Sequence, residues 1–399
     1  MARRLTLDFL RTESGAGIVL ALAVAAAIGV ANSPWASRYF DLLATPIPVR
    51  IADFAQTLSL ASWVADGLMA IFFLVVGMEI KFEVLRGELA SPRRLALPAF
   101  AAAGGLIVPT LCYLVLNLRS HGDIRGWPAA TATDIALALA ILAVVGPSIP
   151  SAVRVFLLTV AIADDLAAVG LTALMFTGKV HAEALAGAGL SLAVLALLSR
   201  WRRAPFLFYA VGFAVVWGFT LDSGVGTSLA GVACAMVVPA GARRAGQESV
   251  LKYFMDSIHP YVAYAVLPLF AFTAAGFPIG PVGSHLVTSP ISLGLLLALA
   301  VGKPLGVFGF SGLAALTRVA RRPTGATWLE LFGAALLCGV GITASLFFGR
   351  MSFAGGGAGD LDEARLGILA GSLLATLSGA AVFVGANARR RDRDETEPR

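Results

Sequence analysis

The stretch Ala161-Ile162-Ala163-Asp164-Asp165-Leu166-Ala167-Ala168 places two adjacent aspartates inside an apolar run from about residue 153 to residue 176. A helix needs about 20 such residues to cross a bilayer, and the two aspartates fall at the midpoint of this run. Ionisable groups at membrane depth are costly, and by default they indicate a functional site. The alternative is that both are structural charges held in salt bridges.

The composition around this stretch is that of a membrane protein. Of 399 residues, 58% are hydrophobic and only 14% are charged, whereas soluble proteins carry about 25% charged residues. No loop is long enough for a soluble domain. We therefore expect one membrane transport domain over 1–399, with helices from about 14 to 386 and a charged, disordered cytoplasmic tail over 387–399. The opening residues do not resemble a cleaved signal peptide.

The net charge of +6 does not indicate nucleic-acid binding, because the basic residues lie at the ends of apolar runs. Basic residues at such places report membrane topology. Cys112, Cys234 and Cys338 all fall inside apolar runs, which predicts buried free thiols with no disulfide framework and no metal spacing.

The apolar runs predict an all-α polytopic fold with twelve membrane spans. The expected spans are 14–31, 61–80, 95–116, 128–146, 151–176, 183–199, 205–220, 224–240, 258–276, 290–314, 327–349 and 364–386. If the N-terminus is cytoplasmic, most lysines and arginines fall in cytoplasmic segments, so we expect both termini inside. On the outer side, the residues from Thr45 to Ile51 alternate weakly, which favours a short strand over the alternative of a surface loop.

The fourth span carries a third intramembrane aspartate. Asp134 follows Thr131-Ala132-Thr133 near the middle of the run. Threonine hydroxyls can satisfy backbone groups that are freed when a membrane helix opens. We expect an opening here because Asp134 needs a polar environment. The alternative is an intact helix whose threonines bond back to their own carbonyl groups.

The tenth and eleventh spans contain two further unusual features. Gly339 and Gly341, followed by Thr343, weaken the eleventh span at its centre, although glycine-rich membrane helices are often just closely packed. Lys303 lies near the middle of the tenth span, where it needs a carboxylate or the negative end of a helix. Pro304 loosens the helix beside it.

Spans four and eleven occupy corresponding places in the triplets 3–4–5 and 10–11–12. Paired interrupted spans of this kind indicate inverted repeats with a binding site at the midplane. Asp134 would then neutralise the positive ends of the opened half-helices, and Lys303 the negative ends.

Two buried carboxylates suit exchange of a hard cation such as Na⁺ for protons. Burial and mutual repulsion both favour protonation of a carboxyl group, so one site can hold protons or the cation. Because Asp164 and Asp165 are adjacent, their protonation is coupled. Competition of this kind couples the two fluxes if the site faces each side of the membrane in turn.

These residues are similar to the NhaA-type bacterial sodium/proton antiporters, in order from about Ser14 to Gly385. The matching stretches are Ala70 to Lys81, Thr131 to Ala136, Ala163 to Leu166, His259 to Tyr264, Gly302 to Gly306 and Leu337 to Thr343. The resemblance implies twelve helices with inverted repeats and two crossed, unwound helices.

By this resemblance, Asp164 and Asp165 alternately take Na⁺ or Li⁺ and protons. Asp134 lies beside the helix crossing, with Thr133 as its neighbour, and Lys303 pairs with an aspartate or compensates helix ends. The family exchanges cytoplasmic Na⁺ or Li⁺ for a larger number of external protons and is therefore electrogenic. It serves Na⁺ and pH homeostasis in the bacterial inner membrane, without a cofactor.

The resemblance also assigns accessory features. Asp66 and Glu79 match acidic residues near the ends of the second helix, with Glu79 towards a cytoplasmic funnel. A homodimer through an outer β-hairpin is implied as well. Gly226 and Met255 stand where pH-regulated members carry a histidine and a glutamate, which predicts weaker or shifted activation by pH.

Other classes of protein fit the residues less well. Intramembrane aspartyl proteases place their aspartates on different helices, and prenyltransferases repeat an Asp-rich motif that is not found twice here, so we do not expect an enzyme. A cation/solute symporter would need a substrate pocket, and no aromatic cluster indicates one. A channel is disfavoured because titratable buried carboxylates suit alternating access better than fast conduction.

Overall fold

The structure is a computed structural model that describes residues 2–51, 54–87, 90, 92–120, 122–175, 180–200, 205–241, 248–279, 288–357 and 359–396. The chain forms two compact units. Unit 1 consists of Met1–Asn32, Ser91–Asp165 and Ala274–Arg399, and unit 2 of Ser33–Ala90 and Leu166–Thr273. The single transport domain stays a prediction.

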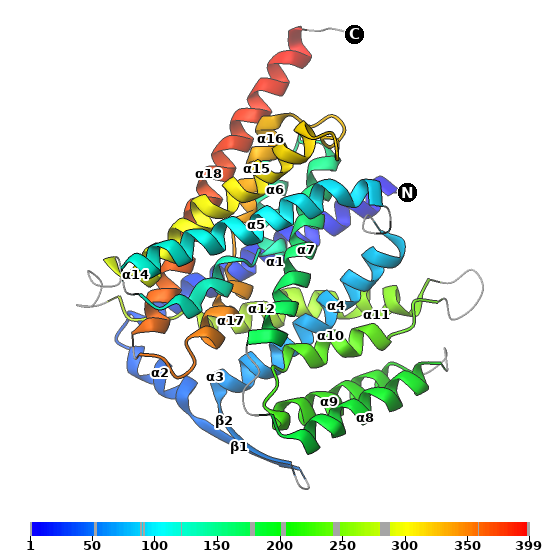
Figure 1. Ribbon diagram of the computed structural model, residues 1–399, viewed down its shortest axis with the longest axis vertical. Helices are drawn as coiled ribbons and strands as arrows, with labels where there is room; N and C mark the ends of the chain where they lie inside the picture. Colours follow the sequence, from blue (N-terminus) through cyan, green and yellow to red (C-terminus); the bar gives the residue numbers. More distant parts are fainter. Residues whose placement is uncertain are drawn as a thin grey trace. The chain divides into compact units, whose positions relative to one another are not determined.

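Unit 1 holds the longest helices (Figure 1). Its elements are α1 (Ala2–Ala31), α5 (Pro92–Arg119), the 3₁₀ segment η3 (Ile124–Ala130), α6 (Ile135–Val145), α7 (Ser151–Met175, which continues into unit 2), α14 (Pro290–Leu297), the π-helical turn η5 (Ala298–Gly302), α15 (Lys303–Leu316), α16 (Trp328–Cys338), α17 (Thr343–Ser352) and α18 (Asp360–Thr396).

Unit 2 combines helices with one small sheet. Its elements are α2 (Ala36–Ala44), β1 (Pro46–Ile51), β2 (Phe54–Ser59), α3 (Leu60–Trp63), the π turn η1 (Val64–Leu68), α4 (Met69–Arg86), α8 (Ala182–Ser199), α9 (Phe206–Ser223), α10 (Ser228–Val237), α11 (Val250–Tyr261), the π turn η4 (Val262–Val266) and α12 (Leu267–Ala274).

Within the described residues, six helices are long and apolar enough to cross a membrane, or nine if each bent helix pair forms one span. This is a polytopic helical protein, as the composition predicts. The count of twelve spans and the inverted repeats stay predictions. All three cysteines are free thiols, as expected from their positions.

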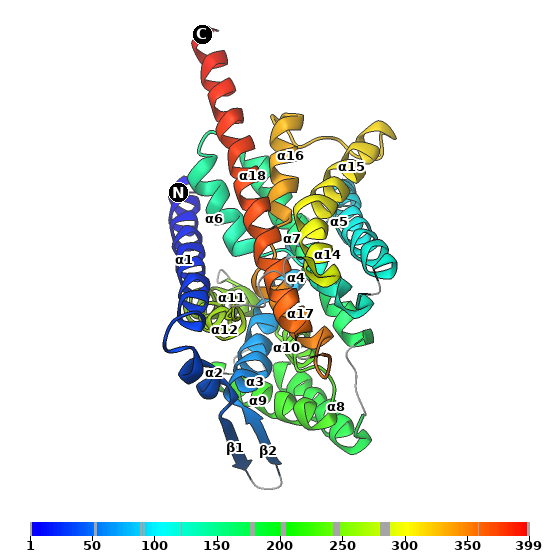
Figure 2. The same cartoon turned by 90° about the vertical axis from the view of Figure 1, so that its left-hand side faces the viewer.

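The strand expected after Thr45 is confirmed. β1 pairs with β2 in an antiparallel hairpin, in the register Pro46 with Ser59 and Ile51 with Phe54. The prolines are tolerated because a two-stranded sheet consists only of edge strands. Figure 2 shows the hairpin as a separate ribbon within unit 2.

Small residues bring the helices of unit 1 together. α5 and α15 run side by side (Figures 1 and 2), and a Cβ at Gly104 would overlap the carbonyl oxygen of Gly306. On α18, Gly367 and Gly371 face α14, and a Cβ at Gly367 would lie 2.5 Å from the carbonyl oxygen of Ser292. Close backbone approach is the usual role of small residues in membrane helices.

Three helix boundaries differ by eight residues or more from the sequence-based expectation. The first helix, expected from about 14, begins at Ala2. The helix predicted from 258 begins at Val250, where Ser249 is the N-cap and its side chain accepts from the N–H of Lys252. The charged residues Lys252 and Asp256 interrupt the apolar pattern, so the apolar run does not reveal this first part of the helix. The tail expected to be disordered is helical as far as Thr396. Arginine and glutamate are good helix formers, and Arg390 is anchored by an ion pair with Glu330.

Candidate functional site

The first break in unit 1 lies between η3 and α6, whose axes differ by 45°. Thr131 ends η3, and its hydroxyl donates to the carbonyl of Pro128 at 2.8 Å. Asp134 is the N-cap of α6, where its Oδ1 accepts from the N–H of Leu137 at 3.2 Å. Side chains that bind nearby backbone groups favour caps over helix interiors, so the chain opens at the residues predicted from the sequence.

The second break lies between α16 and α17, whose axes differ by 43°. A Cβ at Gly339 would overlap the carbonyl oxygen of Leu299, and one at Gly341 would lie 2.7 Å from the carbonyl oxygen of Ala132. Any larger residue would push these backbones apart, since real Cβ atoms do not come so close to an oxygen. The glycines therefore serve close approach as well as the break itself.

The two breaks contact each other directly. The N–H of Asp134 donates to the carbonyl of Val340 at 2.6 Å. Asp134 Oδ2 accepts from both the backbone N–H of Thr343, at 3.2 Å, and its hydroxyl, at 2.8 Å. One buried carboxyl group thus binds N–H groups at the starts of both α6 and α17, the ends where a helix dipole favours negative charge.

Lys303 joins the aspartate of α7 to the first break. Its Nζ lies 3.0 Å from Asp164 Oδ2, and the two side chains are 0% and 1% exposed. The same ammonium group donates to the carbonyl of Thr131, at the C-terminal end of η3. Lys303 follows the π turn η5 and precedes Pro304, which lacks an N–H, so the helix is locally irregular at this point.

Thr133 lies within hydrogen-bonding distance of two acceptors. Its hydroxyl is 2.8 Å from Asp164 Oδ2 and 2.9 Å from the carbonyl oxygen of Cys338. A hydroxyl has a single proton to donate but two lone pairs. If Thr133 donates to Cys338, its contact with Asp164 needs a protonated carboxyl group, whereas an ionised Asp164 receives the Thr133 proton. The arrangement therefore accommodates either protonation state.

Helix α5 covers the ion pair with a glycine. A Cβ at Gly105 would lie 3.7 Å from Asp164 Oδ1 and 3.8 Å from Lys303 Cε. Neither this glycine nor its neighbour Gly104 was predicted at the site from the sequence. Two adjacent glycines in an otherwise apolar span were the available signal.

Three predicted residues remain: Asp165, which is next to Asp164 in the chain, and Asp66 and Glu79, which come from an earlier part of it. Asp165 is 3% exposed and follows Asp164 on α7, about 100° further around the helix. Asp66 lies in the π turn η1, where its carbonyl accepts from Trp217 Nε1 at 2.8 Å. Glu79 lies on α4, and its Oε1 is 4.0 Å from His259 Nε2. Asp66 and Glu79 belong to unit 2.

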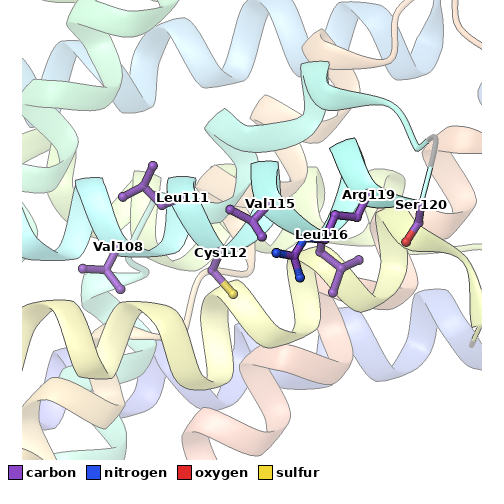
Figure 3. Close-up of a pocket in the computed structure, with 7 residues that line it drawn as sticks. All are labelled: Val108, Leu111, Cys112, Val115, Leu116, Arg119 and Ser120. Atoms are coloured by element: carbon purple, nitrogen blue, oxygen red, sulfur yellow. The ribbon is translucent and has the colours of Figure 1, made fainter.

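A separate pocket of about 610 Å³ runs along one face of α5 (Figure 3). Its lining is mostly aliphatic, with Arg119 and Ser120 at one end. None of its described lining residues is acidic, so these residues do not suit a cation. Carboxylate, hydroxyl and carbonyl oxygens, which hard cations prefer, instead gather at the crossing. Among the described residues no group of three or more His, Cys, Asp or Glu could hold a resident metal.

Comparison with known proteins identifies a family and several similar chains. The family model described as Na⁺/H⁺ antiporter 1 matches residues 7–383. The Na⁺/H⁺ antiporter NhaA of Bordetella parapertussis is 43% identical over 379 residues, which cover 94% of this chain and 95% of the relative. NhaA 2 of Magnetococcus marinus is 41% identical over 376 residues, covering 93% and 95%. NhaA 1 of Pseudomonas syringae is 43% identical over 375 residues, covering 94% of each.

Proposed function

The chain belongs to the Na⁺/H⁺ antiporter 1 family, and from this premise we propose that it exchanges cytoplasmic Na⁺ or Li⁺ for external protons by electrogenic alternating access. It is a multi-pass membrane transporter of Na⁺ and protons, not an enzyme. We place it in a bacterial inner membrane with both termini cytoplasmic. Its physiological role would be Na⁺ and pH homeostasis.

The buried contact of Lys303 and Thr133 with Asp164 is the observation that carries this proposal. Asp164 Oδ2 already lies 3.0 Å from one cationic group, and that group also bonds the carbonyl of Thr131. A Na⁺ ion that binds at Asp164 and Asp165 would compete with the Lys303 ammonium group and with protons for the same oxygens. Binding of the cation would therefore release positive charge from the site, which is what exchange requires.

The hydrogen bonds at the two breaks would hold the groups around the cation site in place before the cation binds. Asp134 balances the starts of α6 and α17, and Lys303 balances the end of η3. Charges near helix ends stabilise broken helices in this way. The backbone beside the cation would be kept open by Thr131, Gly339, Gly341 and Thr343. The Thr133 hydroxyl would donate to Asp164 when that carboxyl group is ionised and accept from it when it is protonated.

Unit 2 would supply accessory functions. Glu79 would attract cations at a cytoplasmic funnel. Asp66 would be an accessory acidic residue near the other end of the same span. Among the described residues, β1 and β2 pair only with each other, so each strand has an unpaired edge, and such edges can pair with another chain. We propose that it joins two copies in a homodimer within the lipid bilayer.

Collapse of a pH gradient in proteoliposomes tests the function. NaCl, LiCl or KCl is added to wild type, Asp164→Asn and Asp165→Asn across a pH series, with a potential-sensitive dye in parallel. Wild type should exchange Na⁺ and Li⁺ for protons with a change in membrane potential, and both variants should be inactive. A wild type that moves protons with none of these cations would overturn the proposal. Exchange without a change in potential would overturn its electrogenic part.

A further inference from the structure

The peptide unit between Val340 and Gly341, at the centre of the second break, is bound at both ends. Its carbonyl accepts from the N–H of Asp134 at 2.6 Å. Its N–H donates to the hydroxyl oxygen of Ser372 at 3.1 Å. Because a peptide unit is planar and stiff, fixing the N–H also fixes the direction of the carbonyl. Ser372 therefore helps to orient the Val340 carbonyl, which accepts from the N–H of Asp134.

Ser372 lies on α18 in a place where it has little freedom to move. The residue is 1% exposed. Its neighbour Gly371 packs on α14, and a Cβ there would lie 3.1 Å from Leu296. One turn further along, Ala375 Cβ lies 3.1 Å from where a Cβ of Gly339 would be. The helix is thus pressed against the break, and the hydroxyl group is held opposite the Gly341 N–H.

We propose that Ser372 is a positioning residue for cation binding. Among the described residues, Ser372 makes no hydrogen bond with Asp164 or Lys303. It acts through the 340–341 peptide on the backbone of Asp134, and so on the crossing beside Asp164. The inference rests on the proposed antiport function. Without the hydroxyl acceptor, the buried Gly341 N–H loses the hydrogen bond that it makes with Ser372, and the loss of a buried hydrogen bond is costly enough to shift the peptide.

The test compares three variants of the full-length protein in proteoliposomes. Ser372→Ala removes the acceptor, whereas Ser372→Thr keeps a hydroxyl group. The matched control is Ser378→Ala on the same helix, where the exposed hydroxyl bonds the carbonyl of Leu374 in its own helix at 2.7 Å. We expect the KM for Na⁺ to rise about tenfold in Ser372→Ala, a change of about 1.4 kcal/mol, with the maximal rate within about twofold. Ser372→Thr and Ser378→Ala should keep the wild-type KM.

Amide hydrogen exchange supplies a readout that does not depend on transport. Exchange over 339–343 should quicken at least about tenfold in Ser372→Ala and not in Ser378→Ala. An unchanged KM in a folded Ser372→Ala protein, or a rate loss without a KM change, would overturn the positioning role. If Ser372→Ala is not recovered folded, Ser372→Cys, whose sulfur is a weaker acceptor, is judged by the same criterion. A wild type that does not transport Na⁺ against protons would overturn the proposed function instead. The amide hydrogen exchange data would still show whether Ser372 protects the Gly341 N–H.

Discussion

Replacing Asp134 with alanine should lower the free energy of unfolding by about 2–6 kcal/mol. The carboxylate binds the backbone N–H groups of Leu137 and Thr343, and both N–H groups are buried at helix starts. Each donor left without a partner costs about 1–3 kcal/mol. The Thr343 hydroxyl can turn towards another acceptor, so it adds little. Asparagine has one carbonyl oxygen and can satisfy one N–H, which predicts about half the alanine loss.

The assay is unfolding in mixed micelles of increasing denaturing detergent, followed by circular dichroism. Asp123→Ala is the matched control, because Asp123 is also an N-cap but lies near the surface. Its hydrogen bonds with Arg125 lower the pKa of Asp123, so the cap is ionised at pH 7, and its loss should cost about 1 kcal/mol. An Asp134→Ala loss no larger than the control would refute the reasoning from buried donors. Equal losses for alanine and asparagine would mean that charge, rather than the count of acceptors, is what matters.

Three further predictions concern packing, the end of α18 and pH. Gly306→Ala should destabilise the protein by several kcal/mol because its Cβ would overlap a carbonyl of α5, whereas Gly309→Ala, which meets nothing within 4 Å, should be neutral or slightly stabilising in the same unfolding assay. Arg390→Ala should cost about 1–3 kcal/mol, since Glu330, whose side chain is 1% exposed, loses its ion pair but keeps the N–H of Thr327; reversal of charge at both partners should recover part of the loss. With Gly226 and Met255, transport rates in liposomes should rise less steeply with alkaline pH than in relatives that carry histidine and glutamate there, and an equally steep rise would contradict this hypothesis.

Much of the crossing could be predicted from sequence because its chemistry is costly in a membrane. Asp134 and Lys303 had to find partners, and the glycines and threonines nearby marked where backbone could open. Ser372 could not be predicted, since a serine in an apolar helix usually bonds its own helix, as Ser378 does. Its role depends on which helix packs against Gly341, and that is a tertiary contact.

The extent of α18 was also beyond the sequence pattern. Apolar periodicity ends near Ala386, and the charged residues that follow resemble a solvated tail. Besides the helix propensity of its residues, the extension is anchored by α16, because Glu330 caps its own helix and also pairs with Arg390. This partner is 60 residues away in sequence, so the local pattern does not reveal it.

Helix α18 also constrains how unit 1 can move. It bonds the second break through Ser372, the end of α6 through Asn387 and the start of α16 through Arg390. The first and last of these points are about 27 Å apart along the helix axis. A tilt of only about 5° would displace one end by about 2 Å relative to the other, enough to break a hydrogen bond. We therefore expect α6, α16 and α18 to move together as one rigid body during the proposed exchange, with any hinge outside these three helices.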